Sequence, residues 1–71
     1  MKKYLVIIEK TRTGYSAFSP DLPGCIATAR TKISIEKRMH EVIEFHIEGM
    51  QIEGKKIPKA HSYSKYLTIV A

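Results

Sequence analysis

The hydrophobic pattern of the sequence changes its period near Thr31. Before Thr31 the apolar residues form a short continuous run at residues 4–8 or alternate with polar residues, as in β-strands. After Thr31 they recur at the spacing of one face of an α-helix. This helical stripe consists of Ile35, Met39, Val42, Ile43, His46, Ile47 and Met50. Because a sheet and an amphipathic helix each have an apolar face to bury, the pattern predicts one small α+β domain.

Short connections between the predicted strands indicate an antiparallel meander. The strands are expected at residues 2–10, 15–19 and 25–30, with a last short strand at residues 66–70 that pairs with a sheet edge or with another subunit. Thr31 is the expected N-cap of the helix, and Gly54 the residue that follows its end. Gly14 is expected to supply a positive φ in the first hairpin. The predicted order is β-β-β-α-β in a single domain, residues 1–71.

The chain has 71 residues and one cysteine, Cys25, so no disulfide can form within it. A domain of this size has a thin core and usually needs a disulfide, a metal or a partner subunit. We therefore expect a homo-oligomer, most simply a dimer, in the reducing cytoplasm. The apolar run at residues 4–8 is too short for a signal peptide or a membrane span, so export and membrane insertion are not expected.

Candidate chemistry is sparse in this sequence. Glu36, His40 and Glu44 share a helix face, so a surface metal is conceivable, but a solvated helix face is favoured. Cys25 opens a strand and no nucleophile motif surrounds it, which favours a small apolar residue beneath the helix. The four glycines are scattered and form no phosphate loop. We expect no catalytic residue, no metal and no cofactor.

The net charge of +5 raises the question of nucleic-acid binding. Residues 54–71 carry four lysines and no acidic residue, together with Tyr63 and Tyr66 as possible stacking side chains. Residues 32–53 instead carry five acidic and three basic residues. Four of these acids, Glu36, Glu41, Glu44 and Glu48, are expected on the exposed helix face, where they would repel phosphates. Sequence-specific DNA binding is therefore not expected.

A specific motif follows the second predicted strand. Gly14 and Tyr15 precede a loop that reads Pro20, Asp21, Leu22, Pro23, Gly24 and Cys25. With the third strand and the Thr-capped helix, this order closely resembles the HicB-like antitoxin domain. The resemblance runs from about Tyr4 to Pro58.

The resemblance implies a type II toxin–antitoxin role, in which the domain binds and inhibits a small basic ribonuclease, HicA, that cuts mRNA. It also implies a fold like a stripped-down ribonuclease H, although the strands offer only Glu9 for such chemistry. The implied motif and partner-binding residues are Gly14, Tyr15, Pro20, Asp21, Leu22, Pro23, Gly24, Cys25, Glu41, Glu44 and Glu48. Longer family members append a DNA-binding domain, which is not expected here. Two alternatives stay open: a small basic RNA-binding module, and an orphan regulatory domain that binds another protein.

Overall fold

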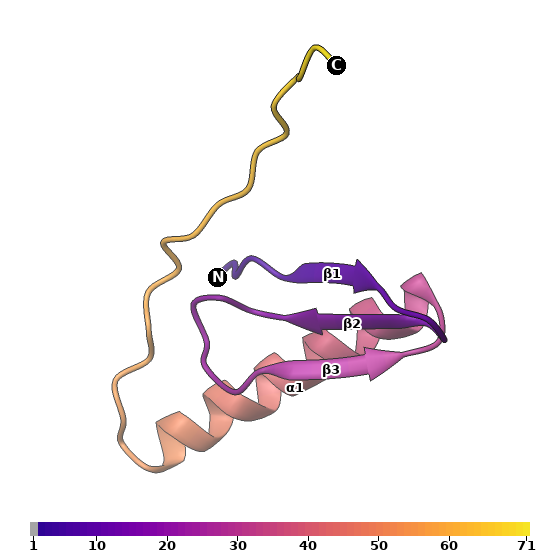
Figure 1. Ribbon diagram of the computed structural model, residues 1–71. Helices are drawn as coiled ribbons and strands as arrows, with labels where there is room; N and C mark the ends of the chain where they lie inside the picture. Colours follow the sequence, from indigo (N-terminus) through magenta and orange to yellow (C-terminus); the bar gives the residue numbers. More distant parts are fainter. Residues whose placement is uncertain (1) are drawn as a thin grey trace.

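The computed structural model describes residues 2–71, which form three strands followed by one helix (Figure 1). The strands are β1 (Ile7–Lys10), β2 (Tyr15–Phe18) and β3 (Ile26–Ala29), and the helix is α1 (Lys32–Ile52). The strands pair antiparallel in the order β1-β2-β3, so each strand lies beside its neighbour in sequence. This arrangement confirms the predicted α+β class and the three-stranded meander.

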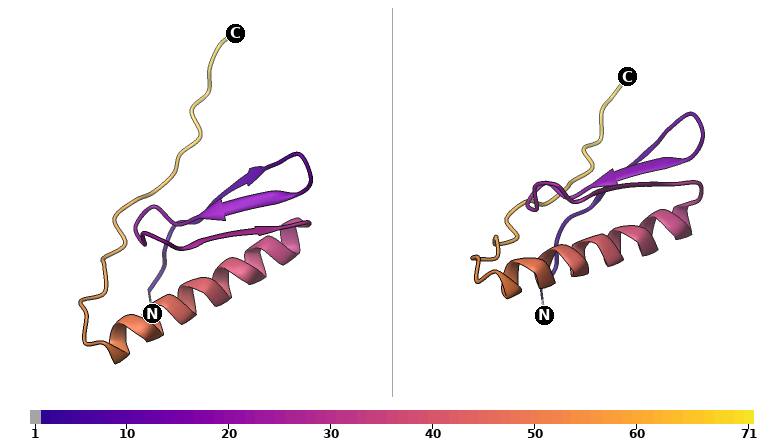
Figure 2. Two further views of the ribbon diagram at one scale, coloured as in Figure 1. Left: turned by 60° about the horizontal axis from the view of Figure 1, so that its bottom comes forward. Right: turned by 90° about the horizontal axis from the view of Figure 1, so that it is seen from below.

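The register of the strands separates two faces of the sheet. Ala17 lies opposite Ile8 and Ala27, and it is buried towards α1. Phe18 lies opposite Ile7 and Ile26, and since side chains alternate along a strand, this row points to the other face. The helix covers one face only and packs mainly against β3 and β2 (Figure 2). The helix-facing side of β1 is therefore left largely uncovered.

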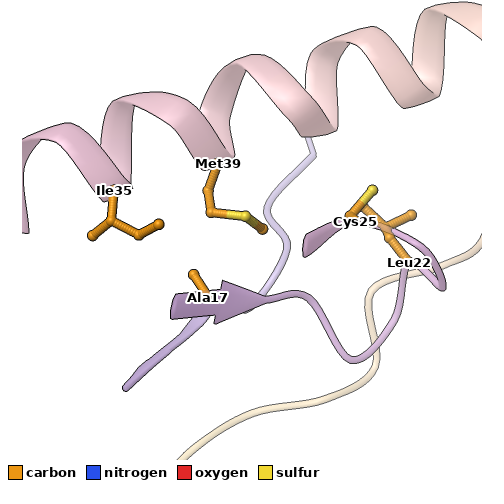
Figure 3. Packing of buried hydrophobic residues seen from close by; sticks show 5 residues of the cluster. All are labelled: Ala17, Leu22, Cys25, Ile35 and Met39. Carbon is orange, nitrogen blue, oxygen red and sulfur yellow. The ribbon is translucent and has the colours of Figure 1, made fainter. Parts of the chain in front are cut away.

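The core is a cluster of five buried side chains, Ala17, Leu22, Cys25, Ile35 and Met39 (Figure 3). Ile35 and Met39 stand one turn apart on α1 and point towards Ala17 on β2. Leu22 and Cys25 come from the loop between β2 and β3, which lies at the end of the sheet. Burying each of the larger side chains stabilises the fold by about 1.5–3 kcal/mol. The expected place of Cys25 beneath the helix is confirmed.

Local chemistry fixes both ends of α1. At its start, the Thr31 hydroxyl accepts a hydrogen bond from the Ser34 amide at 3.0 Å, and the Ser34 hydroxyl accepts one from the Thr31 amide at 3.1 Å. This reciprocal pair is a capping box. At its end, Gly54 takes a φ of 71°, and the Lys55 amide donates to the Met50 carbonyl at 2.9 Å. The predicted N-cap and the predicted helix end are both confirmed.

The expectation of a positive φ at Gly14 is wrong. Among residues 2–71 the glycines with positive φ are Gly24 and Gly54. Gly14 is needed for a different reason: a Cβ atom there would meet the carbonyl oxygen of Ala29 and lie 2.9 Å from the Cα of Arg30. The turn between β1 and β2 thus packs directly on the end of β3, where a side chain has no room.

The structure does not show the expected last strand. Residues 55–71 form neither helix nor strand, and within residues 2–71 the segment 66–70 pairs with no other strand. Its pairing with another subunit stays a prediction. The first strand begins at Ile7, not at residue 2, because β2 ends at Phe18 and the chain then turns away into the loop. The likeness to ribonuclease H stays a prediction. Over residues 2–71, no helix has both the length and the apolar character that crossing a lipid bilayer requires.

Candidate partner-binding groove

A groove lies between α1 and residues 2–8, which lead into β1 and form its first two positions. The groove has a volume of about 800 Å³ and is open to solvent. Its apolar lining is formed by Tyr4, Val6, Ile8, Met39, Ile43 and Ile47. Its polar lining is formed by Lys2, Glu36, His40, Glu44, Glu48 and Gln51. The groove exists because α1 packs mainly on β3 and β2 and leaves one side of its apolar stripe without a cover.

The charges of the groove lie mainly on the helix side. Glu36, Glu44 and Glu48 are all exposed. The Oε1 atom of Glu44 lies 3.1 Å from Nδ1 of the His40 ring. An apolar floor with carboxylates on one rim suits an apolar protein segment that is flanked by lysines or arginines. The arrangement can therefore hold a basic protein partner.

The metal hypothesis for this helix face finds no support in the geometry. Glu36, His40 and Glu44 do lie on one side of α1, as the spacing predicts. Across residues 2–71, however, no three histidine, cysteine or carboxylate side chains converge as metal ligands would. Within the groove these residues act as charged rim groups.

The loop at residues 20–25 is compact and closed by its own backbone. The Cys25 amide donates to the Leu22 carbonyl at 3.1 Å, and the Leu22 amide donates to the Ser19 carbonyl at 3.2 Å. Leu22 is fully buried and Cys25 is 1% exposed. Burial raises the pKa of the Cys25 thiol, so it stays protonated near neutral pH and is a poor nucleophile. The buried part of the motif thus builds the fold.

Asp21 binds the C-terminal segment to this loop. Its Oδ2 accepts hydrogen bonds from the His61 and Ser62 amides at 3.1 and 3.0 Å, and its Oδ1 accepts one from the Ser62 hydroxyl at 2.7 Å. The two hydrogen bonds from Ser62, and then the hydrogen bond from the His61 amide and the electrostatic attraction of the His61 ring, hold the pKa of Asp21 below its ordinary value. The ring Nδ1 of His61 lies 3.1 Å from Asp21 Oδ1. Nearby, the Tyr4 hydroxyl donates to the Pro58 carbonyl at 2.7 Å. We call these two attachments the clasp.

The structure divides the residues implied by the family resemblance into three places. Gly14 and Tyr15 lie at the hairpin end of the sheet, whereas the loop residues lie at the opposite end. In the loop, Asp21, Leu22 and Cys25 are buried, and the exposed ones are Pro20, Pro23 and Gly24. On the helix, Glu44 and Glu48 line the groove, and Glu41 is exposed outside it. The partner-binding role of these residues stays a prediction.

Sequence reasoning missed the groove and the clasp. The groove depends on which strands α1 packs against, and no local sequence pattern encodes that choice. The alternation of Tyr4, Val6 and Ile8 is the signal that could have placed three apolar side chains on one face. No signal of this kind links Asp21 to Ser62, because the two residues are 41 positions apart.

Comparison with known proteins finds one matching family and several relatives that are similar in sequence. The family model for the HicB-like antitoxin of bacterial toxin–antitoxin systems matches residues 4–69. An uncharacterized 14.9 kDa protein of the rep-hol intergenic region of Haemophilus phage HP1 is 36% identical over 64 residues, and the chain spans only 48% of its length. A UPF0150 protein of Synechocystis is 35% identical over 94% of this chain and 86% of the relative. A UPF0150 protein of Archaeoglobus fulgidus is 36% identical over 65% of this chain and 68% of the relative.

A solved structure gives the same answer for the fold. A chain of the HicA3 and HicB3 toxin–antitoxin complex superposes with a TM-score of 0.72 and is 32% identical in sequence. The match covers 84% of this chain and 70% of that chain. The loop at residues 20–25, the meander and the capped helix lie inside the stretch matched by the family model. The chain therefore belongs to the HicB-like antitoxin family of bacterial toxin–antitoxin systems.

Proposed function

We propose that this protein is an antitoxin that binds and neutralises a small basic ribonuclease toxin of the HicA type. The observation that carries the proposal is the groove beside α1, which combines an apolar floor with a rim of carboxylates. The toxin docks an apolar segment on Val6, Ile43 and Ile47, and its cationic groups meet Glu44 and Glu48. Inhibition follows from protein contact that covers the toxin, without catalysis by the antitoxin.

The charge distribution suits such a partner although the whole chain is basic. The net charge is +5, but residues 32–53 carry five acidic and three basic residues, so the carboxylates are concentrated on α1. Charges that oppose each other across an interface accelerate association and select the partner, while the apolar contacts hold the complex together. A basic toxin would meet the acidic helix side first and be repelled by the lysines of residues 54–71.

Family membership supports the class of partner. The solved structure with the similar fold is a toxin–antitoxin complex of HicA3 and HicB3. The resemblance of the motif to HicB-like antitoxins implies a toxin that cleaves mRNA. For this chain, we infer a toxin of that type as the partner of the groove.

Co-expression in a bacterial host tests the proposal. A small basic protein encoded next to this chain should arrest growth alone, and the antitoxin should restore growth and co-purify with it. The double variant Glu44→Lys/Glu48→Lys reverses two rim charges and should weaken the complex at least about tenfold. The matched control Glu9→Lys/Glu53→Lys reverses two exposed carboxylates outside the groove and should bind as the parent does. Absence of any toxic neighbour, or equal binding by all three proteins, would refute the proposal.

The same architecture argues against sequence-specific DNA binding by these residues. The helix is committed to the sheet through Ile35 and Met39, and its exposed sides carry glutamates. Affinity for DNA should therefore depend on phosphate contacts alone, in large part those of the lysines of residues 54–71. Such binding is indifferent to sequence and is largely lost between about 50 and 200 mM salt. A footprint on a defined operator at physiological salt would contradict this expectation.

A further inference from the structure

The segment beyond the clasp, residues 63–71, has many apolar side chains and nothing to pack against. Tyr66 and Val70 are 101% and 99% exposed, and Leu67 and Ile69 are 71% and 74% exposed. The segment is extended and leaves the body on the side of β1, away from α1 (Figures 1 and 2). Exposure of so many apolar side chains to water is unfavourable, so the segment should pair with another strand.

The segment has the composition of a strand that is buried on both faces. Tyr66, Thr68 and Val70 fall on one side of an extended chain, and Leu67 and Ile69 on the other. β-Branched and aromatic residues dominate it, as in strands of a sheet interior. It needs an edge that has apolar side chains on both faces.

The free edge of β1 offers such a site. β1 pairs with β2 on one side only, so its other side presents unpaired backbone groups. Ile7 points to the open face of the sheet beside Phe18, whereas Ile8 points into the groove. The apolar part of this edge is Ile7 and Ile8, since β1 continues with the charged residues Glu9 and Lys10. The edge of β3 is less suitable, because α1 packs mainly against β3 and covers one face of it.

The chain cannot easily bring this segment back to its own β1. The clasp fixes His61 and Ser62 at Asp21, and the segment continues from there away from the body. Among the residues that favour tight turns, residues 63–71 contain only Ser64 and no glycine, proline, asparagine or aspartate. In a second copy of the chain, residues 63–71 project in the same way. Each copy can therefore offer its β1 edge to the segment of the other copy.

We propose that two copies of this chain exchange residues 63–71, and that each segment adds as a strand to the free edge of the other copy's β1. The clasp holds the start of the exchanged segment and thereby sets its direction. The added strand extends the sheet beside the groove and leaves the acidic rim on α1 free, so the exchange does not depend on the proposed toxin.

Sedimentation and amide exchange over a range of protein concentrations test this proposal. The parent should sediment at twice the chain mass of 8.1 kDa at micromolar concentration and become monomeric on dilution. Amide protection of residues 66–70 should fall with the same dilution. Protection that is independent of concentration would mean pairing within one chain, and a parent that is monomeric at 100 micromolar would equally overturn the exchange.

Matched variants identify the surfaces involved. Thr68→Pro removes a backbone donor from the segment and should give monomers, whereas Thr68→Ala should remain dimeric. Both variants should fold, because Thr68 is exposed and lies outside the core. Ile7→Lys on β1 should weaken the dimer at least tenfold, and Ile26→Lys on β3 should leave it unchanged. A dimer that survives Thr68→Pro, or is broken by Ile26→Lys and not by Ile7→Lys, would contradict the proposed exchange at β1.

Discussion

The loop at residues 20–25 and the groove beside α1 differ in how clearly the sequence marks them and in how much of each is exposed to solvent. The loop is the most conspicuous motif of the sequence, yet Leu22 and Cys25 are buried and Asp21 is bound to the C-terminal segment. The groove has no motif, yet it presents apolar and acidic side chains to solvent. The buried residues of the family signature therefore build the domain, whereas the groove is exposed to solvent and its apolar lining lies outside the signature.

If this contrast holds, the largest loss of stability should come from the centre of the loop. Leu22 is fully buried, so Leu22→Ala removes three carbons from the core and leaves a cavity. Such changes cost about 2–5 kcal/mol, a large part of the total stability of a domain of this size. Urea denaturation should show the loss, and Ile33→Ala, at a position that is 83% exposed, should show almost none. Equal midpoints for the two variants would break the contrast.

The backbone of the loop gives a second, smaller test. Gly24 has a φ of 89°, and a Cβ there would meet no atom within 4 Å, so Gly24→Ala should destabilise through backbone conformation alone, by about 1 kcal/mol. Gly49 in α1 is equally open, and Gly49→Ala should stabilise the helix by up to about 1 kcal/mol. Thermal melts should therefore shift in opposite directions. A common direction would show that the loop does not need its left-handed residue.

Asp21 should affect only the C-terminal segment. Asp21→Asn removes the charge and one of the two accepting oxygens, so the amides of His61 and Ser62 should exchange faster while those of the sheet keep their protection. Glu41→Gln is the matched control without contacts to this segment.

The same contact should respond to acid. Because hydrogen bonds lower the pKa of Asp21 in the folded chain, the Asp21 attachment of the clasp is fully formed above the ordinary value of 3.8 and is lost as the pH falls through the lower folded value. A proton titration followed by the amide shift of Ser62 should show this acid release, and Asp21→Asn should abolish it. Release that begins above pH 5 would mean that another group controls the clasp.

The smallest change in stability should come from the groove. Glu48 is exposed on the rim, and Glu48→Gln should alter the free energy of unfolding by no more than about 0.5 kcal/mol. The same variant should weaken toxin binding several-fold at low salt and less at high salt, since salt screens exposed charges. Titration calorimetry at two salt concentrations measures the difference, and a stability loss as large as that of Leu22→Ala would remove the distinction between the two regions.

Local sequence chemistry predicted the parts of the fold that depend on near neighbours. The period change at Thr31 gave the three strands and the helix, and the Thr31–Ser34 and Gly54 caps follow from residues within one turn. The reason for Gly14 was missed, because it depends on Ala29 and Arg30 in another strand. The strand at residues 66–70 was predicted from β-propensity, but a strand forms only where an edge is available.

The candidate site was less predictable for the same physical reason. Glu44 and Glu48 were identified as partner-binding residues from the family resemblance, and both line the groove. The apolar floor was not identified, because it combines side chains of residues 4–8 with side chains of α1, and these two parts are far apart in sequence. Asp21 was recognised as a motif residue, but its bond to Ser62 spans 41 positions, and sequence patterns of short range carry no information on such pairs.

The clasp is also the part of the domain that is expected to form last during folding. Sheet and helix are built from consecutive elements, whereas the Tyr4–Pro58 and Asp21–Ser62 bonds join residues 54 and 41 positions apart. Contacts between distant residues form late, since closing the long loop between them costs more entropy. The meander and α1 can therefore fold before either bond of the clasp has formed, and the clasp can open again without unfolding them.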